Sequence, residues 1–108
     1  MNKKEKIMKP SELLEKYDWC QRDYARDINH CVTTIHSPNA VKFCLLGAIK
    51  KVDKEGYANL LSDYCLLVFG SIHIPYVNDN ILKTKQDAIN LLKQVEEIYE
   101  KEQRKVHT

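Results

Sequence analysis

A nearly all-apolar run in the middle of the chain most constrains its fold. Val41–Ile49 contains a single charged residue, a lysine. A helix that is hydrophobic on almost every side has no face to give to water, so we predict that this run is helical and lies at the centre of the fold. Ser37 followed by Pro38 is typical of a helix start, which predicts a helix from residue 37 to about residue 54. Gly47 predicts a close helix crossing, because a glycine inside a helix costs about 1 kcal/mol relative to alanine.

Helical patterns also occur on both sides of this run. Ser11 follows Pro10 and is a good N-cap for a short amphipathic helix that ends near Trp19. Apolar residues recur at helical spacing over Tyr57–Phe69, which predicts a third, largely buried helix that ends at Gly70.

The last predicted helix is long and starts at a capping box. Thr84 and Asp87 have the spacing of that motif. One apolar stripe follows it, formed by Ala88, Leu91, Leu92, Val95, Ile98 and Tyr99. In the segment before this helix, Pro75 and the turn residues 78–80 favour a connecting loop over a strand in residues 72–77.

These patterns predict an all-α fold in which four helices form one compact domain over residues 1–108. A long irregular loop follows the first helix, with a turn at Asn29–His30 and a stretch at Cys31–Ile35 that favours an extended backbone. A chain of 108 residues is long enough for one core and too short for two ordinary domains. Residues 1–9 and 103–108 are expected to fray.

Composition excludes several classes of protein. Apolar residues make up 44% and charged residues 30%, which is ordinary for a globular domain. With 17 basic and 15 acidic residues, the net charge of +2 gives no basis for general nucleic-acid binding. No signal peptide is expected, and no apolar stretch approaches the roughly 20 residues that cross a bilayer. We expect a cytoplasmic protein without a membrane span.

The four cysteines are predicted to be reduced, because Cys44 and Cys65 lie in apolar runs where a thiol packs as a small hydrophobe. A zinc site drawn from His30, Cys31, His36 and Cys44 lacks the paired spacing of structural zinc ligands. Only Cys20, next to Arg22, has an electropositive setting for a reactive thiol, and no histidine spacing selects a partner for it. We therefore predict no catalytic residue, no metal and no cofactor.

Two polar clusters suggest a binding site. The candidate residues are Trp19, Gln21, Tyr24, Arg26, Asp27, Asn78 and Asp79. The two aromatic rings can stack on a planar ligand, the arginine fork matches carboxylate or phosphate, and the amides can bind hydroxyl groups. The alternative is structural: Arg26 pairs with Asp27 or Asp79, Trp19 belongs to the core, and the Asn78–Asp79 pair forms a turn.

The order of these motifs resembles a family of short, uncharacterised proteins of bacteria and their phages. The resemblance rests on Trp19-Cys20-Gln21, Ala25-Arg26-Asp27, Ala40, Phe43–Ile49, Val77-Asn78-Asp79 and the helix that Thr84 begins. It covers most of the chain. It implies a compact α-helical domain, encoded by a phage.

The functional prediction is non-catalytic binding. The first hypothesis is a phage accessory or anti-defence protein that sequesters a small anionic, nucleotide-like molecule in the host cytoplasm. It predicts a concave pocket around Trp19 and Arg26. The alternative, a module that masks a host protein, predicts an exposed apolar patch or a homo-oligomeric face. A small hydrolase is the third hypothesis, and it requires an acid or a thiol inside the pocket.

Overall fold

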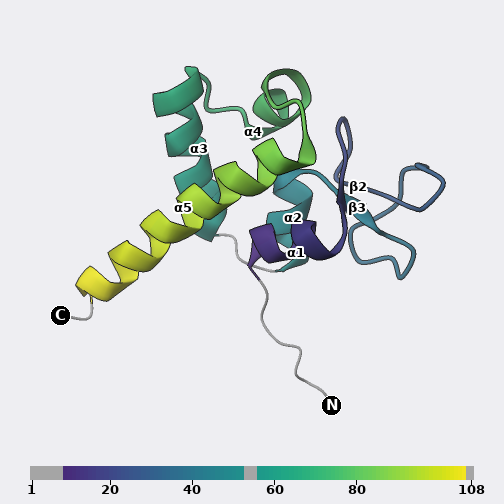
Figure 1. Ribbon diagram of the computed structural model, residues 1–108, viewed down its shortest axis with the longest axis horizontal. Coiled ribbons are helices and arrows are strands. Elements are labelled where there is room, and N and C mark those ends of the chain that lie inside the picture. Colours follow the sequence, from purple (N-terminus) through teal and green to yellow (C-terminus); the bar gives the residue numbers. More distant parts are fainter. Residues whose placement is uncertain (1–8, 53–55, 107–108) are drawn as a thin grey trace, which may run out of the picture.

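The computed structural model describes residues 9–52 and 56–106, and it places a small sheet at one side of a group of helices (Figure 1). In these residues the helices are α1 (Pro10–Lys16), α2 (Leu45–Lys51), α3 (Gly56–Phe69), the short α4 (Ile74–Tyr76), the π-helix η1 (Val77–Ile81) and α5 (Lys85–Val106). The strands are β1 (Asp18–Trp19), β2 (Ala25–Arg26) and β3 (Lys42–Phe43). The prediction of an all-α, four-helix fold is therefore wrong, because the domain is α+β.

The sheet has the order β1-β3-β2. β1 runs parallel to β3, with Trp19 opposite Phe43, and β2 runs antiparallel to β3, with Ala25 opposite Phe43. The first helix, predicted to end near Trp19, ends at Lys16, and β1 takes up the end of its predicted range. The irregular loop predicted after it contains β2. Its predicted turn is present, since His30 has a φ of 68° and its amide donates to the carbonyl of Asp27 at 2.9 Å. The stretch expected to be extended contributes one isolated bridge, between Val32 and Arg26.

The helix predicted for residues 37–54 is also wrong in its first half. Ser37–Ala40 forms a turn in which the amide of Ala40 donates to the carbonyl of Ser37 at 3.1 Å. Lys42–Phe43 then pairs with a strand on each side, and these backbone bonds replace helical ones. Helix α2 begins only after Cys44, whose sulfur accepts the amide of Gly47 at 3.2 Å.

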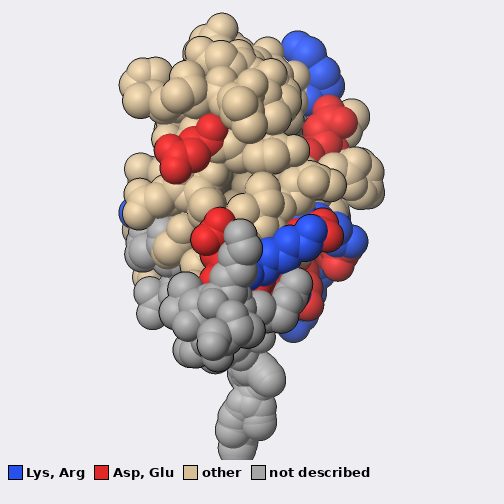
Figure 2. Space-filling model, turned by 90° about the vertical axis from the view of Figure 1, so that its left-hand side faces the viewer, with Lys and Arg blue, Asp and Glu red and all other residues tan. Residues whose placement is uncertain are grey.

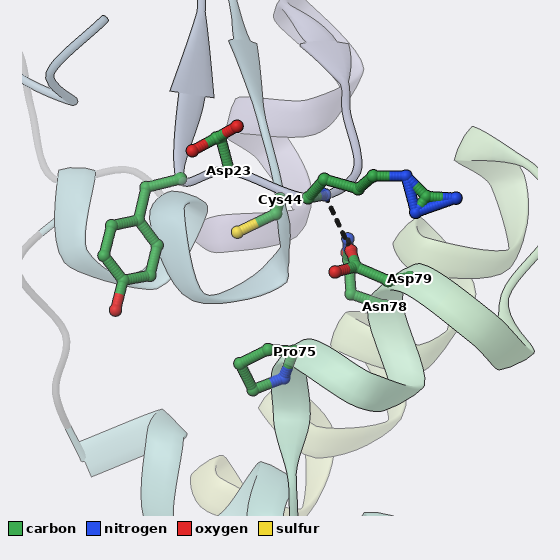
Figure 3. A pocket seen from close by; sticks show the side chains of 7 residues that line it. Asp23, Cys44, Pro75, Asn78 and Asp79 are labelled. Atoms are coloured by element: carbon green, nitrogen blue, oxygen red, sulfur yellow. Dashed lines mark hydrogen bonds between the residues drawn. The ribbon is translucent and has the colours of Figure 1, made fainter. Parts of the chain in front are cut away.

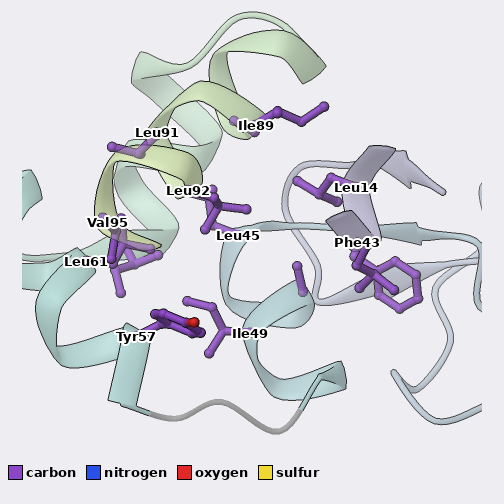
Figure 4. Close-up of a cluster of buried hydrophobic side chains, with 14 of the residues drawn as sticks. Leu14, Phe43, Leu45, Ile49, Tyr57, Leu61, Ile89, Leu91, Leu92 and Val95 are labelled. Atoms are coloured by element: carbon purple, nitrogen blue, oxygen red, sulfur yellow. The ribbon is translucent and has the colours of Figure 1, made fainter. Parts of the chain in front are cut away.

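The central position of this run is confirmed. Phe43, Leu45 and Ile49 are fully buried, and they meet side chains of α1, α3 and α5 in one core (Figure 4). Around them Figure 4 labels Leu14, Tyr57, Leu61, Ile89, Leu91, Leu92 and Val95. The core thus lies beside the sheet and under α5, which crosses the molecule diagonally in Figure 1.

The predictions for the third and last helices are confirmed in extent. α3 ends at Gly70, which has a φ of 77° and donates to the carbonyl of Leu66 at 3.0 Å. At the start of α5, Thr84 Oγ1 accepts the amide of Asp87, and Asp87 Oδ2 accepts the amide of Thr84, both at 3.1 Å. The expectation that α3 is largely buried is wrong, because only Tyr57, Leu61 and Cys65 of this helix are buried.

The start of α1 and the segment before η1 differ from the sequence prediction. Ser11 lies inside the first turn of α1 and not at its cap; its amide and hydroxyl donate to Glu96 of α5 at 2.8 and 2.6 Å. Residues 72–77, predicted as a loop, include α4, because Pro75 is compatible with the first turn of a helix. Of the residues predicted to fray, 1–8 and 107–108 lie outside the described residues, whereas Lys9 is the N-cap of α1 and 103–106 continue α5.

Candidate functional site

Asn78 connects the two polar clusters. It lies in η1 with 1% of its surface exposed. Its Oδ1 accepts the indole N–H of Trp19 at 2.8 Å and the amide of Leu45 at 3.0 Å. Its Nδ2 donates to the carbonyl of Cys20 at 3.1 Å and to Asp79 Oδ1 at 3.0 Å. All four hydrogen-bonding positions of the side-chain amide are therefore used within the protein.

The amide of Asn78 takes the place of a peptide group in the sheet. β1 and β3 pair through Trp19 and Phe43, and the amide of Cys20 donates to the carbonyl of Phe43 at 3.1 Å. The next bond of a parallel ladder would join the Cys20 carbonyl to the Leu45 amide. Both groups bond to the side chain of Asn78 instead. Asn78 thus fills the opening where the two strands separate.

Gln21 and Asp79 extend this connection. Gln21 Nε2 donates to the carbonyls of Asn78, Asp79 and Leu82 at 3.0 to 3.4 Å, at the C-terminal end of η1. Asp79 Oδ1 accepts the amide of Arg22 at 2.8 Å. Arg22 has a φ of 76°, which is uncommon for a residue other than glycine, and this bond helps to hold it there.

Arg26 and Asp27 bind within their own loop. The guanidinium of Arg26 donates to the carbonyl of His30 at 2.9 Å, to the carbonyl of Gln21 at 3.4 Å and to Asp23 Oδ2 at 3.0 Å. Among the described side chains, Arg26 Nε is a buried nitrogen without a hydrogen-bond partner. Asp27 Oδ1 accepts the amides at positions 29 and 31, both at 2.9 Å. These contacts match the structural alternative for Arg26, although its partner is Asp23 and not Asp27 or Asp79.

A hollow of about 240 Å³ lies beside the meeting point of the clusters (Figure 3). Its lining comprises Arg22, Asp23, Tyr24, Cys44, Pro75, Asn78 and Asp79. Of the seven candidate residues, only Tyr24, Asn78 and Asp79 are in this lining. The side chains of Trp19 and Gln21 form hydrogen bonds with η1 instead, and those of Arg26 and Asp27 form hydrogen bonds within their own loop.

Sequence reasoning missed Arg22, Asp23, Cys44 and Pro75 as lining residues. No sequence motif marked Asp23 or Pro75 as a site residue, and Cys44 was predicted to lie inside a helix. The thiol of Cys44 points into the hollow between Asp23 and Pro75 (Figure 3). Burial raises the pKa of this thiol, and the backbone amides at the start of α2 oppose that shift only in part. Burial likewise raises the pKa of Cys20 to about 12. Both thiols are therefore protonated at neutral pH, which is unsuited to nucleophilic catalysis.

A second unusual surface lies on α3 and the segment that follows it. Leu66, Leu67, Val68, Ile72 and Tyr76 are all at least half exposed, and we call them the α3 apolar face. Figure 2 shows the side of the molecule on which α3 lies, and its upper half has few charged side chains. Next to it, a groove of about 330 Å³ runs between α3 and α5, with Val68, Phe69, Ile81 and Leu91 in its lining.

Comparison with known proteins identifies the family. The model of a family of unknown function, DUF6197, matches residues 7–98, which is most of the chain. The protein belongs to DUF6197. The matched range contains the sheet, Asn78 and the hollow, so the site described above lies within the part that defines a DUF6197 protein. The resemblance to an uncharacterised family is confirmed, and the bacterial or phage origin stays a prediction. None of the curated proteins or solved structures compared with this DUF6197 chain matches it.

Two further findings concern metals and membranes. Within residues 9–52 and 56–106, no group of three or more His, Cys, Asp or Glu residues is placed to hold a metal ion. In the same part of this DUF6197 protein no single helix is long and apolar enough for a membrane span, although α3 and Ile74–Ile81, bent by 57°, together meet both criteria.

Proposed function

We propose that this DUF6197 protein is a non-catalytic binding protein that docks a partner protein through the α3 apolar face. One observation carries the proposal: the large apolar side chains of the α3 apolar face are all at least half exposed, and Leu67 is 83% exposed. Several exposed large apolar side chains gathered on one segment of a small domain are typical of protein–protein contact sites. Of the functional hypotheses drawn from the sequence, the masking alternative is the one that requires such a surface.

The charge around this face favours a particular kind of partner. Residues 56–82 contain no lysine or arginine, and their only acidic residues are Asp63 and Asp79. Asp87 lies in the adjoining groove and accepts the amide of the exposed Lys83. With few charges of either sign nearby, this face favours a partner whose own contact surface is apolar. The proposed partner is a different protein with an exposed apolar segment, as the masking hypothesis requires.

The biological setting of the proposal comes from the family resemblance. A short phage protein without catalytic residues can act in the host cytoplasm as an accessory or anti-defence factor by occupying a host protein. The small-hydrolase hypothesis requires an acid or a thiol inside the pocket, and it has less support. The thiol of Cys44 in the lining is protonated at neutral pH, and the lining carboxylates of Asp23 and Asp79 already accept hydrogen bonds from within the protein.

A photocrosslinking experiment tests the docking proposal. A benzoylphenylalanine at position 67 should crosslink to a host protein in cells, whereas the same group at Asn39, an exposed loop position, should not. The partner, once purified, should bind Leu67→Asp at least tenfold more weakly than wild type. Asn39→Asp should bind normally, and neither variant should change the melting temperature. Equal crosslinking at the two positions, crosslinks between copies of this chain, or unchanged affinity of Leu67→Asp would each contradict the proposal.

A small ligand in the hollow is a second candidate function, favoured by the way both polar clusters converge beside it. The carboxylates of Asp23 and Asp79 in its lining favour a ligand with N–H donors or positive charge. The anionic, nucleotide-like ligand stays a prediction and would have to pair with Arg22 against these carboxylates. Native mass spectrometry of protein from phage-infected cells should show a retained molecule, which Tyr24→Ala should lose. Protein that carries no added mass would contradict this candidate.

A further inference from the structure

We propose that Cys20 and Cys44 form a reversible disulfide when the protein meets a peroxide. The parallel register of β1 and β3 pairs Asp18 with Lys42 and Trp19 with Phe43, so the next pair along the register is Cys20 and Cys44. The amide of Cys20 still donates to the Phe43 carbonyl, so the two backbones remain adjacent there. This inference is independent of the proposed partner.

The geometry of neighbouring strands suits such a bond. Adjacent strands lie about 4.8 Å apart, and paired residues point to the same face of a sheet. Disulfides join residues whose Cα atoms are about 4.4 to 6.8 Å apart. The other two cysteines have no such arrangement: Cys65 lies in the core on α3, and Cys31 lies exposed in the loop after β2.

Each sulfur is now held by weak contacts with the backbone. Cys20 Sγ donates to the carbonyl of Asp23 at 3.6 Å, and Cys44 Sγ accepts the amide of Gly47 at 3.2 Å. Hydrogen bonds of thiols are weak, so a side-chain rotation that brings the sulfurs together forfeits little. Cys44 also lines the hollow, which gives a molecule as small as hydrogen peroxide a route to its sulfur.

The oxidation has two steps. The Cys44 thiol releases its proton, and the thiolate attacks one peroxide oxygen, so that an S–O bond forms and the O–O bond breaks; the departing hydroxide takes up that proton to become water. The Cys20 sulfur, after losing its own proton, then attacks the Cys44 sulfur, so that the S–S bond forms and the S–O bond breaks; the second hydroxide leaves as water with the proton from Cys20. Two thiols lose two electrons and two protons, and the peroxide is reduced to water. Because burial raises the pKa of both thiols, the reaction is slow at neutral pH and accelerates as the pH rises.

The bond would change the site as well as the thiols. It would withdraw Cys44 Sγ from the hollow and from the amide of Gly47 at the start of α2. Because a disulfide is cleaved by an added thiol, the oxidation is reversible by a reductant that reaches the hollow.

Intact-mass measurement and peptide mapping test the proposal on the full chain. Reduced Cys31→Ser protein treated with hydrogen peroxide should lose the mass of two hydrogen atoms per chain, and a non-reducing digest of the oxidised wild-type protein should link the peptides of Cys20 and Cys44. Dithiothreitol should reverse both changes. Cys31→Ser and Cys65→Ser should keep the linkage, and Cys20→Ser and Cys44→Ser should abolish it.

The wild-type digest decides the matter even if a serine variant fails to fold. The exposed Cys31 serves as an internal control for the oxidant. If Cys31 is oxidised while Cys20 and Cys44 remain open to alkylation after denaturation, the proposal is wrong. A linkage that involves Cys31 or Cys65 within one chain would overturn it equally.

Discussion

The side-chain amide of Asn78 donates to the backbone carbonyl of Cys20, 58 residues earlier in the chain. Through this bond and its contact with Leu45, the end of a two-residue strand is joined to a helical turn and to the start of α2. Asn78→Ala leaves both backbone groups without a partner in a buried place. We expect a loss of about 2–4 kcal/mol in the free energy of unfolding, measured by urea denaturation.

The matched control for this prediction is Asn80→Ala. Asn80 is exposed in the same helical turn and donates only to the carbonyl of Tyr76 at 3.3 Å. Its truncation should change the free energy of unfolding by less than about 0.5 kcal/mol. Equal effects of the two substitutions would show that Asn78 does not complete the sheet.

Gly47 provides a second test of the packing around the sheet. A Cβ atom at this position would lie 2.1 Å from the carbonyl oxygen of Tyr24, which belongs to the backbone of a loop. The predicted close approach exists, but to a loop and not to a helix. Gly47→Ala should therefore destabilise the protein strongly, by about 3 kcal/mol or more, despite the higher helix propensity of alanine.

Gly56→Ala is the comparison for Gly47→Ala. There a Cβ atom would lie 3.2 Å from a ring carbon of Tyr99, a side chain that can shift. We expect a lowering of the melting temperature much smaller than that of Gly47→Ala. A Gly47→Ala variant as stable as Gly56→Ala would contradict the close contact between Gly47 and the backbone of Tyr24.

Glu96 should make stability depend on pH. Burial raises the pKa of this carboxyl, and the bonds from Ser11 oppose that shift only in part. The folded state therefore binds the proton more tightly than the unfolded state. The stability that this provides is fully present below the unfolded pKa of about 4.5 and is lost as the pH rises through the higher folded value.

Urea denaturation across this pH range measures the effect. Glu96→Gln cannot ionise, so its free energy of unfolding should fall less than that of wild type as the pH increases from 4 to about 7. Glu97→Gln, on the exposed side of α5, should follow the wild-type profile. Parallel profiles for wild type and Glu96→Gln would contradict the raised pKa.

Arg26→Ala separates a structural role from a binding role. The guanidinium joins the carbonyls of Gln21 and His30 to the carboxylate of Asp23, so its removal should cost about 1–3 kcal/mol of stability. The exposed Arg22→Ala should cost less than about 0.5 kcal/mol, because Arg22 contributes a backbone bond to Asp79. If Arg26→Ala keeps the wild-type melting temperature but loses affinity for an anion, Arg26 is a binding residue and not a structural one.

The sequence predicted the elements that local signals determine. α3 carries a 3.6-residue pattern with Gly70 after it, and α5 begins at a capping box whose reciprocal bonds both form. The sheet could not be predicted this way. Each strand has two residues, too few for a period-two pattern, and β3 is defined by partners that lie up to 24 positions away.

The candidate site was predicted only in part, for a related reason. Polar residue types mark Trp19, Gln21, Arg26 and Asn78 as unusual, but they do not say which groups these side chains meet. Asn78 bonds to groups 33 and 58 residues away, so its burial depends on the tertiary fold. The hollow includes Cys44 because the apolar run changes from strand to helix at that residue.

The bond between Ser11 and Glu96 has a consequence for synthesis on the ribosome. These residues are 85 positions apart, and α1 has its largest set of contacts with α5. α1 also packs against α2, but it cannot complete its packing until α5, the last described helix, has been synthesised. Contacts so distant in sequence slow folding, so the nascent chain keeps its apolar surfaces open until translation of the domain is nearly complete.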